Sequence, residues 1–587
     1  MAIAKVHIKM SAKSLSINVS KWRYWAVIAI LMIFPISILI KVAFLQILPS
    51  QKYGFDFLKN QGEIRAIRKI SIPAVRGSIL DRNGKPLAIS TPVIDIVGNP
   101  QKIMTQDHTK LADALGISVQ ILRNRLDLYK EKSFVYLSRQ LSDQDAKAIL
   151  DLNIKGISQE KQFKRFYPAG EVTAQLVGIT DYMDSGQEGL ELAFNDWLKG
   201  EEGFKKVVMD EKRRVISNLA LLKSSKPGNN LRLSIDLRIQ YAAYTELKKS
   251  VKKHGAKAGS IVVLDVSTGE IIAMVNQPSF NPNNRTTLDQ AALRNRAITD
   301  LIEPGSTVKP FTILAALESG KYDAASVVDT SPGYLKVDYK TFVDPVNYGN
   351  LDLTGVLSKS SQVGTTKIAL NLNPELVRDV FSRVGFGDYV GSGFPGETMG
   401  SLPAYRSWHP VTQATFAFGY GISVSPLQLA KAYGILANNG LKRDVTLLAV
   451  EEIASSSRVL DKDISHDVTR MLTSAVSKTG TGKNAIIDSY SVAGKTGTLH
   501  KVKSQGGYED NKYISAFAGF SPTKNPQIVT VVIIDEPAKG DYFGGLVAAP
   551  IFSKVTERAL QLMQISPDKA LRPHSHGDAV FKKGESS

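Results

Sequence analysis

The stretch GSIVVLDVSTGEIIAMVNQ, residues 259–277, decides the fold of the largest part of this chain. Two apolar runs of strand length flank the turn sequence Ser-Thr-Gly at 267–269, which predicts a hairpin of two buried strands. Two more apolar runs, YISAFAGFSP at 513–522 and QIVTVVIID at 527–535, are joined by a polar turn. They predict a second pair of buried strands.

Long helical patterns lie between these two strand pairs, at residues 310–317 and 426–438. Strands at both ends of a region with helices between them are typical of an α/β or α+β domain whose sheet is completed by its first and last segments. NLRLSID at 230–236 predicts a short strand that leads into a helix. We therefore expect a C-terminal domain over 229–565, followed by a polar, basic and disordered tail over 566–587.

Within this domain, EPGSTVKPFTILAALESG at 303–320 has a serine and a lysine three positions apart. A Pro-Gly pair interrupts the preceding structure and the apolar run 311–317 predicts a helix, so Ser306 and Lys309 are expected on one face of its first turn. A buried lysine near other cations can lose its proton and become the base that a serine nucleophile needs. The alternative, a capping serine and a solvated lysine, stays open on this segment alone.

The tetrapeptide Lys-Thr-Gly-Thr occurs twice, from Lys478 and from Lys495. The first copy ends an amphipathic helical pattern, which predicts Lys478 in the last helical turn and Gly480 or Gly482 as the cap. It also lacks the flanking residues of a phosphate-binding loop. The second copy follows a strand-like run, and on a strand a lysine, a threonine and a backbone N–H can line one edge of a cleft. We therefore assign the chemistry to residues 495–498.

These elements resemble the signature of the penicillin-binding proteins, which consists of Ser-x-x-Lys, Ser-x-Asn and Lys-Thr-Gly in this order. RNRAI at 294–298 with 303–310 is similar to the nucleophile segment, and FGYGISVSPLQLAKAYGILANNG at 418–440 is similar to the stretch before Lys-Thr-Gly. Upstream, RGSILDRNG, RFYPAG and GQEGLE are similar to motifs of the non-catalytic pedestal of class B members. The similarity reaches from the anchor to about residue 560 and is greatest to the FtsI-type, cell-division branch.

The resemblance implies a multidomain α/β (α+β) protein whose transpeptidase domain has an antiparallel sheet with helices. It also implies that Ser306 attacks the D-Ala-D-Ala bond of a peptidoglycan stem peptide with Lys309 as the base. The segment LSKSSQVGTTKIAL aligns with the middle element, so Ser360 is the implied proton relay and Gln362 stands where the family usually has asparagine. Glutamine places the same carboxamide one methylene further out. We therefore expect altered substrate and β-lactam affinity with an unchanged reaction class.

The resemblance further implies a substrate-binding strand made of Lys495, Thr496, Gly497 and Thr498. The two threonines and the lysine hold the terminal carboxylate of the substrate, and the backbone N–H groups of Ser306 and Thr498 form an oxyanion hole worth about 3 kcal/mol per donor. The acyl-enzyme is then taken by an amine of a neighbouring strand. Neither a metal nor an organic cofactor is expected, and no glycosyltransferase activity is expected.

An apolar stretch near the N-terminus predicts a membrane anchor. YWAVIAILMIFPISILI at 24–40 has no charge, and after Lys41 the apolar character continues to Leu48, which is long enough to cross a hydrocarbon core of about 30 Å. The stretch exceeds a signal-peptide core, and a buried core helix is the alternative. Five basic residues and no acidic one precede the span, which predicts a cytoplasmic tail over 1–21 and an anchor over 22–48. The resemblance places the anchor in the inner membrane and the catalytic domain in the periplasm.

The region between the anchor and the C-terminal domain, residues 49–228, has no recognisable nucleophile arrangement and is interpreted as the pedestal (dimerisation-type) domain. Residues 49–70 are polar and mixed in charge and predict a linker. RGSILDRNGKPLA at 76–88 predicts a hairpin with a type I′ turn at 83–84. SGQEGLELAFNDWLKGEEG at 185–203 predicts one amphipathic helix. The predicted apolar face of that helix consists of Leu190, Phe194, Trp197 and Leu198.

Composition excludes several classes of site and partner. The 587 residues contain no cysteine, which excludes a disulfide framework and thiolate metal sites. The formal charge of +18 suggests an anionic neighbour such as lipid or cell-wall polymer, although a generic solvated surface explains it equally well. Zinc-finger spacing and compact arginine blocks do not occur, so nucleic acid is not an expected partner.

The resemblance also implies partners: peptidoglycan stem peptides, β-lactam antibiotics, the membrane, a glycosyltransferase of the FtsW type beside the anchor, and regulatory division proteins on the pedestal. Four alternatives stay open. A β-lactamase or β-lactam sensor would differ in the rate of deacylation, and a D,D-carboxypeptidase would release D-alanine without cross-linking. Depletion of an elongation-type transpeptidase gives round cells instead of filaments. A scaffold without activity, supported only by Gln362, would not be labelled by a fluorescent penicillin.

Overall fold

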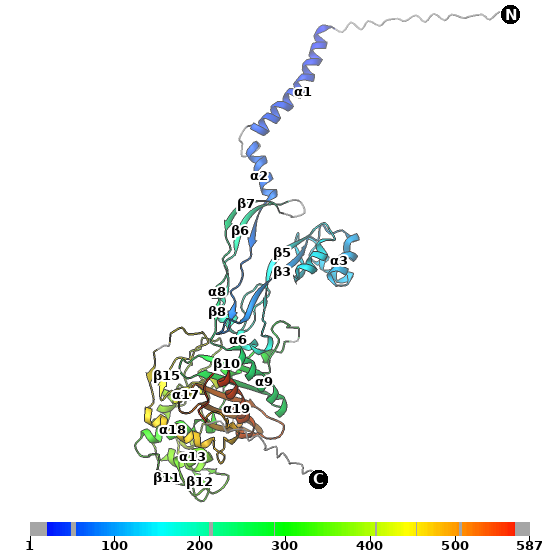
Figure 1. Ribbon diagram of the computed structural model, residues 1–587. Coiled ribbons are helices and arrows are strands. Elements are labelled where there is room, and N and C mark those ends of the chain that lie inside the picture. Colours follow the sequence, from blue (N-terminus) through cyan, green and yellow to red (C-terminus); the bar gives the residue numbers. More distant parts are fainter. Residues whose placement is uncertain are drawn as a thin grey trace, which may run out of the picture.

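The computed structural model describes residues 20–47, 54–209, 215–286, 288–404, 408–452, 455–503 and 507–569. Figure 1 shows an elongated molecule with helix α1 (Lys21–Ile47) at one end, a β-rich middle part, and a globular C-terminal part at the other end. The tails predicted at the two ends of the chain lie outside the described residues, except for positions 20–21 and 566–569.

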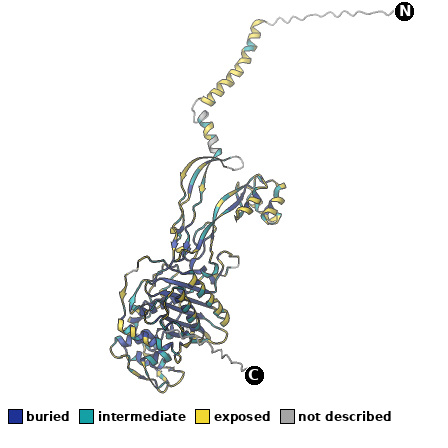
Figure 2. Ribbon diagram, viewed as in Figure 1, coloured by how far each residue is buried: buried dark blue, intermediate teal, exposed yellow. Residues whose placement is uncertain are grey.

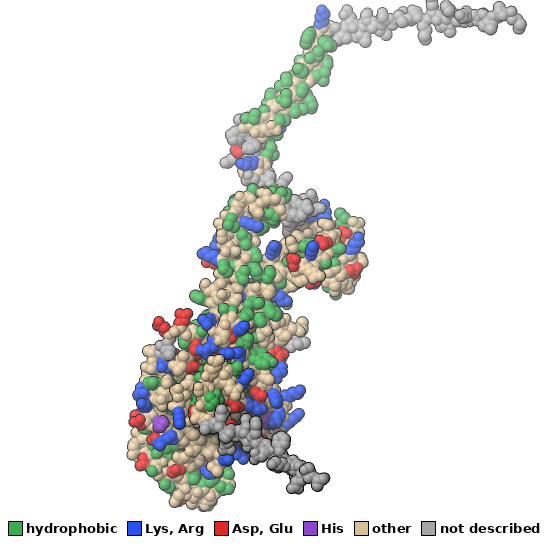
Figure 3. All heavy atoms as spheres, in the orientation of Figure 1, with side chains coloured by type: hydrophobic (Ala, Val, Ile, Leu, Met, Phe, Trp, Pro, Cys, Tyr) green, Lys and Arg blue, Asp and Glu red, His purple; other side chains and the backbone are tan. Residues whose placement is uncertain are grey.

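Helix α1 is exposed along its whole length. It has 27 residues, none of them buried, and hydrophobic side chains cover it (Figures 2 and 3). At 1.5 Å per residue it spans about 40 Å, which exceeds the hydrocarbon core of a bilayer. Because no described part of the protein covers it, the alternative of a buried core helix is wrong, and α1 fits a single membrane anchor.

The chain next to the anchor is folded, so the predicted linker over 49–70 is wrong from residue 55 onward. Helix α2 (Phe55–Ala66) leads into β1 (Ile67–Ile72). β1 pairs with β6 (Gly203–Met209), which pairs with β7 (Val215–Lys223), in a three-stranded antiparallel sheet. β1 is short, only three of its six residues (IRKISI) are apolar, and its partner lies far away in the chain, so the local pattern did not reveal the strand.

A second sheet forms the rest of the pedestal. Its strands follow the order β4-β3-β2-β8, with β5 also paired to β3. Three helices cover one end of it around a core that includes Leu111, Leu122 and Leu137. The bounds are β2 (Ile79–Leu80), β3 (Pro86–Gly98), α3 (His108–Leu115), α4 (Val119–Leu128), β4 (Val135–Leu141), α5 (Asp143–Leu150), β5 (Ile157–Phe166), α6 (Ala174–Val177) and β8 (Leu231–Arg232). We call α3, α4, β4 and α5 the side lobe; it projects sideways from the long axis in Figure 1.

The hairpin predicted at 76–88 is confirmed as β2 and β3, but its turn is not type I′. Only Gly84 has a positive φ, of 79°, whereas a type I′ turn needs two such residues. The carboxylate of Asp81 accepts hydrogen bonds from the backbone N–H groups of Asn83 (2.8 Å) and Lys85 (2.7 Å). This aspartate-centred turn spans more residues than the two that the dipeptide suggested.

The single amphipathic helix predicted over 185–203 is wrong. The structure has two short helices, α7 (Gly189–Ala193) and α8 (Asn195–Leu198), and Trp197 is 53% exposed. At the break between them, the side-chain oxygen of Asn195, the first residue of α8, accepts hydrogen bonds from Arg76 Nη1 (3.0 Å) and from the N–H of Gly186 (2.9 Å). This tertiary contact interrupts the local periodicity.

The C-terminal part is built on one five-stranded antiparallel sheet of order β10-β9-β19-β18-β17, which confirms the predicted sheet. Its first and last segments meet, since Val262 on β9 pairs with Val531 on β19. Every residue of β9 and β10 is buried, as expected from their continuous apolar runs. The bounds are β9 (Ala258–Asp265), β10 (Ile271–Gln277), β17 (Ala493–Val502), β18 (Tyr508–Ser521) and β19 (Ile528–Asp535).

Helices cover both faces of this sheet. α9 (Leu237–His254) and α19 (Gly544–Leu562) bury one face in a core with Ile261 and Val532. α12 (Lys309–Glu318) and α17 (Pro426–Ala437), which confirm the two predicted helices, share the core of the other face with Val262. The remaining elements are α10 (Gln290–Leu293), α11 (Arg296–Thr299), β11 (Val327–Asp329), β12 (Tyr334–Val337), β13 (Lys340–Val343), β14 (Asn350–Asp352), α13 (Leu353–Lys359), α14 (Gln362–Leu370), α15 (Pro374–Arg383), α16 (Pro410–Phe416), β15 (Leu441–Lys442), β16 (Ser457–Arg458) and α18 (Lys462–Ala475).

Candidate active site

Ser306 lies in a 3₁₀ turn, Gly305–Val308, directly before α12, which Lys309 begins. The predicted first turn of the α-helix is therefore a tighter turn. Gly305 has a φ of 54°, and a Cβ at this position would lie 2.3 Å from Leu499 Cδ2. Gly419 packs on the other side, where a Cβ would lie 2.4 Å from the Gly305 carbonyl oxygen. Two glycines thus let the serine turn pack directly against β17.

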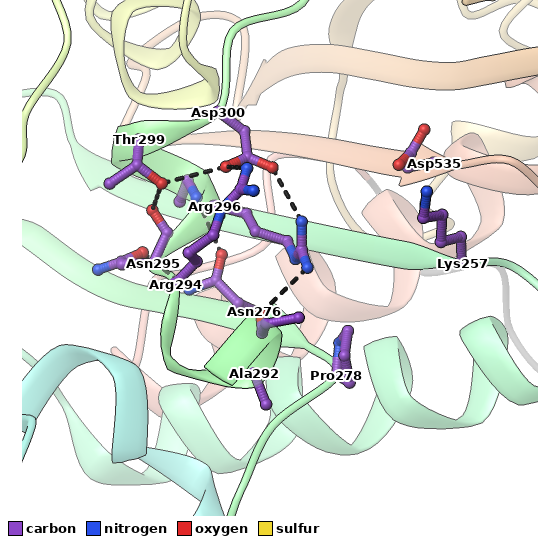
Figure 4. A network of polar contacts seen from close by, with 12 residues as sticks. Lys257, Asn276, Pro278, Ala292, Arg294, Asn295, Arg296, Thr299, Asp300 and Asp535 are labelled. Atoms are coloured by element: carbon purple, nitrogen blue, oxygen red, sulfur yellow. Dashed lines mark hydrogen bonds and ion pairs between the residues drawn. The ribbon is translucent and has the colours of Figure 1, made fainter. Parts of the chain in front are cut away.

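Hydrogen bonds and ion pairs hold the segment that leads to this turn, both against the sheet and internally (Figure 4). Asn276 on β10 donates a hydrogen bond from Nδ2 to Oδ1 of Asn295 at 2.8 Å. Arg294 and Arg296 both pair with Asp300, the latter at 3.0 Å. The motif RNRAI is therefore structural: it sets the path of the chain toward residue 303.

Two buried lysines meet at one serine hydroxyl. Ser360 Oγ lies 3.3 Å from Lys309 Nζ and 2.9 Å from Lys495 Nζ, and both lysines donate to it. Lys309 Nζ also donates to the carbonyl oxygens of Ser360 (2.7 Å) and Ser361 (3.2 Å). Ser360 has a left-handed backbone (φ 58°, ψ 37°) at the end of α13, which is uncommon for a residue with a side chain and occurs where a site requires it.

Burial changes the charge state of this pair. Both lysine side chains are fully shielded from solvent. Burial lowers the pKa of Lys309 to about 7, against the opposing effect of the Asp344 carboxylate. Burial, and then the positive charge of Lys309, hold the pKa of Lys495 well below its ordinary value. At neutral pH the pair therefore holds fewer than two positive charges, so a neutral amine is present to take a proton.

Asp344, which the sequence did not reveal, holds the middle element in place. Its Oδ1 accepts the backbone N–H groups of Gln362 (2.6 Å) and Val363 (3.3 Å), and the Ser361 hydroxyl donates to Oδ2. Asp344 is 4% exposed. It lies in a loop before the element, and neither spacing nor periodicity connects it to Ser360.

The second Lys-Thr-Gly-Thr copy lies on β17, as predicted, and β17 is the edge strand of the sheet. Gly497 faces the serine turn so closely that a Cβ would lie 2.9 Å from Thr307 Cγ2. The hydroxyl of Thr498 accepts the N–H of Gly544 at 2.9 Å. The structure thus brings together the serine turn, Ser360 with Gln362, and residues 495–498.

The first copy follows the end of α18, since that helix stops at Ala475; the placement of Lys478 in its last turn is wrong. The N–H of Gly482 still donates to the carbonyl oxygen of Ala475 at 2.9 Å. The unexpected finding is that Thr496 Oγ1 donates to Thr481 Oγ1 at 3.2 Å. The last threonine of the first copy therefore borders the site, whereas Lys478 is exposed.

Two family descriptions match the chain. "Penicillin binding protein transpeptidase domain" matches residues 259–557, and "Penicillin-binding Protein dimerisation domain" matches residues 71–233. The first match contains the serine turn and both lysines, and the second contains most of the pedestal strands.

Curated relatives cover nearly the whole chain. The chain is 39% identical to "Probable peptidoglycan D,D-transpeptidase PbpC" of Pseudomonas aeruginosa, over 93% of this chain and 96% of the relative. It is 38% identical to "Peptidoglycan D,D-transpeptidase FtsI" of Escherichia coli, over 97% and 96%. Among solved structures, it is similar to penicillin-binding protein 3 of Mycobacterium tuberculosis in complex with aztreonam (TM-score 0.67, 26% identity, 86% of this chain and 99% of that chain). It is also similar to the transpeptidase domain of penicillin-binding protein 3 from Burkholderia pseudomallei (TM-score 0.53, 38% identity, 58% and 98%).

Proposed function

Because this chain belongs to the class B penicillin-binding proteins, we propose that it is a peptidoglycan D,D-transpeptidase that works through an acyl-enzyme on Ser306. The observation that carries the residue roles is the meeting of the Lys309 and Lys495 side chains at the hydroxyl of Ser360. A serine turn beside two lysines of lowered pKa is the arrangement that activates a hydroxyl without a histidine.

Acylation follows from these positions. Ser306 Oγ attacks the carbonyl carbon of the penultimate D-alanine, and neutral Lys309 takes the hydroxyl proton. The carbon–nitrogen bond then breaks, and the leaving D-alanine amine receives a proton through Ser360. The products are a Ser306 ester and free D-alanine. In the second step an amine of a neighbouring stem peptide attacks the ester, its proton returns through the same groups, and the Ser306 hydroxyl is restored.

Substrate binding uses the edge of β17. Lys495, Thr496 and Thr498 hold the terminal carboxylate, whose negative charge favours a protonated Lys495 once substrate is bound. The backbone N–H groups of Ser306 and Thr498 stabilise the oxyanion. Gln362 starts α14, and its carboxamide hydrogen-bonds the substrate amide from one methylene further out than asparagine does.

The rate of acylation by a penicillin is expected to rise with pH through about 7. Lys309 acts in its neutral form, and burial lowers its pKa to about 7, so each unit of pH below that value removes about nine tenths of the active form. Above about pH 8 the rate should level off. Stopped-flow acylation kinetics between pH 5.5 and 9 measures this profile, and a rate that stays flat across the range contradicts a lysine base.

Mass spectrometry of the penicillin-treated full chain in detergent tests the nucleophile. We expect one covalent adduct, located on the peptide that contains Ser306, and release of D-alanine from a stem-peptide substrate. An adduct on another residue, or no adduct at all with a folded protein, would reject the assignment.

The cellular role is also part of the proposal. The 38% identity to a relative named FtsI, over nearly the whole of both chains, supports a role in septal wall synthesis. We place the anchor in the inner membrane with its N-terminus in the cytoplasm, and residues beyond it in the periplasm. An FtsW-type glycosyltransferase beside α1 and division regulators on the pedestal are the proposed protein partners, with stem peptides and β-lactams as ligands.

A further inference from the structure

The side lobe carries an open groove of about 800 Å³, which is within the size range of ligand sites. Residues at the end of α4, in the following turn, and at the start of β4 line it. The lobe projects away from the globular part that holds Ser306 (Figure 1), so the groove is separate from the proposed active site.

Three aromatic rings stand in this groove: Tyr129, Phe134 and Tyr136. The rings of Phe134 and Tyr136 are 4.9 Å apart and perpendicular, so they form two adjoining walls. All three side chains are partly accessible to solvent. Half-exposed aromatic walls are a surface against which the apolar C–H faces of sugar rings can pack, while the phenol groups keep hydrogen bonds to hydroxyls or water.

Cations line part of the same groove. Its lining includes Arg125, Lys132 and Arg139 together with the carboxylate of Glu131, while the carboxylates of Glu160 and Asp95 lie near the Tyr136 hydroxyl. Lys132 Nζ lies 5.3 Å from the centre of the Tyr129 ring, and the Arg139 guanidinium lies 3.6 Å from the centre of the Tyr136 ring. The Arg139 guanidinium therefore covers one face of Tyr136, and a ligand that packs on Tyr129 or Phe134 meets Lys132 and Arg139 as donors for its carboxylates.

We propose that this groove binds a glycan strand that carries stem peptides, with sugar rings on Tyr129 and Phe134 and the peptide carboxylates on Lys132 and Arg139. The inference rests on the proposed function for its location, because a periplasmic transpeptidase meets such a polymer as the backbone of its substrate. Binding at the lobe raises the local concentration of stem peptides near the catalytic domain without any contact to Ser306. An acidic protein segment is the competing occupant. It has no sugar rings to pack against the aromatic walls.

The test measures binding of the full chain in detergent to soluble peptidoglycan glycan strands that keep their stem peptides, with polyglutamate as the acidic polymer without sugars. Arg139→Glu is expected to weaken glycan binding about tenfold or more. Arg123→Glu is the matched control, because Arg123 is exposed on α4 of the same lobe and does not line the groove. Phe134→Leu, which keeps apolar volume and removes a ring, should weaken glycan binding several-fold and leave polyglutamate binding unchanged.

Each outcome separates the occupants. Equal loss of glycan binding in the Arg139 and Arg123 variants would mean that general surface charge accounts for the binding, which overturns the proposal. Polyglutamate that binds as tightly as the glycan overturns it in favour of an acidic segment. Penicillin acylation of Ser306 should be unchanged in all three variants. Acylation of the unmutated chain tests the proposed function independently: a parent chain that binds glycan but is not acylated rejects the function and not the groove.

Discussion

Replacing Ser306 with alanine is expected to abolish covalent labelling by penicillin and to lower D-alanine release by about 10⁴-fold or more. The variant removes the only atom that forms the ester, while the two lysines and Ser360 keep their contacts with each other. Alanine also suits the position, because Ser306 is partly exposed in a turn whose backbone the neighbouring glycines set. The measurement is intact-protein mass together with D-alanine release by the full chain.

Ser250→Ala is the matched control for this variant. Ser250 is also followed by a lysine three positions later, but it lies on α9, on the opposite face of the sheet. Its replacement should leave labelling within twofold of the parent. If Ser306→Ala retained the adduct, or if Ser250→Ala lost it in a protein with unchanged thermal unfolding, the assignment of the nucleophile would be wrong.

Lys495→Ala is expected to slow acylation by about 10²- to 10³-fold, whereas Lys478→Ala leaves it within twofold. Lys495 is buried and donates to Ser360 Oγ at 2.9 Å, so its loss removes both a charge at the relay and a partner for the substrate carboxylate. Lys478 occupies the same place in an identical tetrapeptide but is exposed. The second-order rate constant of acylation measures both effects.

Because Lys495 is buried, a folding defect must be separated from a chemical one. Lys495→Arg keeps the positive charge at a different geometry, and Lys495→Met keeps most of the volume without charge. If all three Lys495 variants unfold at the parent temperature and acylate at the parent rate, β17 does not take part in the reaction. Slow acylation in the Lys478 variant would instead show that the first Lys-Thr-Gly-Thr copy contributes more to the reaction than Thr481 alone.

The core of the fold could be predicted because its strands are buried on both faces. The runs on either side of the turn at 267–269 and the run at 527–535 are mostly apolar, and such runs indicate buried strands without knowledge of their partners. The short strand β1 and the broken helix at 185–203 could not be predicted, since pairing with β6 and the contact of Asn195 with Arg76 involve residues far away in the sequence. Local periodicity fails where tertiary contacts decide.

The residues of the candidate site could likewise be predicted only in part. Ser306, Lys309 and residues 495–498 stand out because nucleophile chemistry needs those residue types at those spacings. Asp344 and Thr481 could not be predicted, because their roles depend on hydrogen bonds that no sequence spacing encodes: those between Asp344 and residues 361–363, and the one between Thr481 and Thr496. Supporting contacts of this kind become visible only when the loops are in place.

The pairing of β9 with β19 has a consequence for the order of synthesis. The strand that begins at Ala258 pairs with β10 on one side and with the strand that ends at Asp535 on the other, and β17 is joined to that last strand only through β18. Every residue assigned to the chemistry precedes position 499, yet β17, which carries Lys495 to Thr498, joins the rest of the sheet only through β18 and β19, and β19 ends 37 residues after Thr498. We therefore expect a chain that ends before β19 to be inactive although it contains every catalytic side chain, so that activity appears only once the sheet is complete.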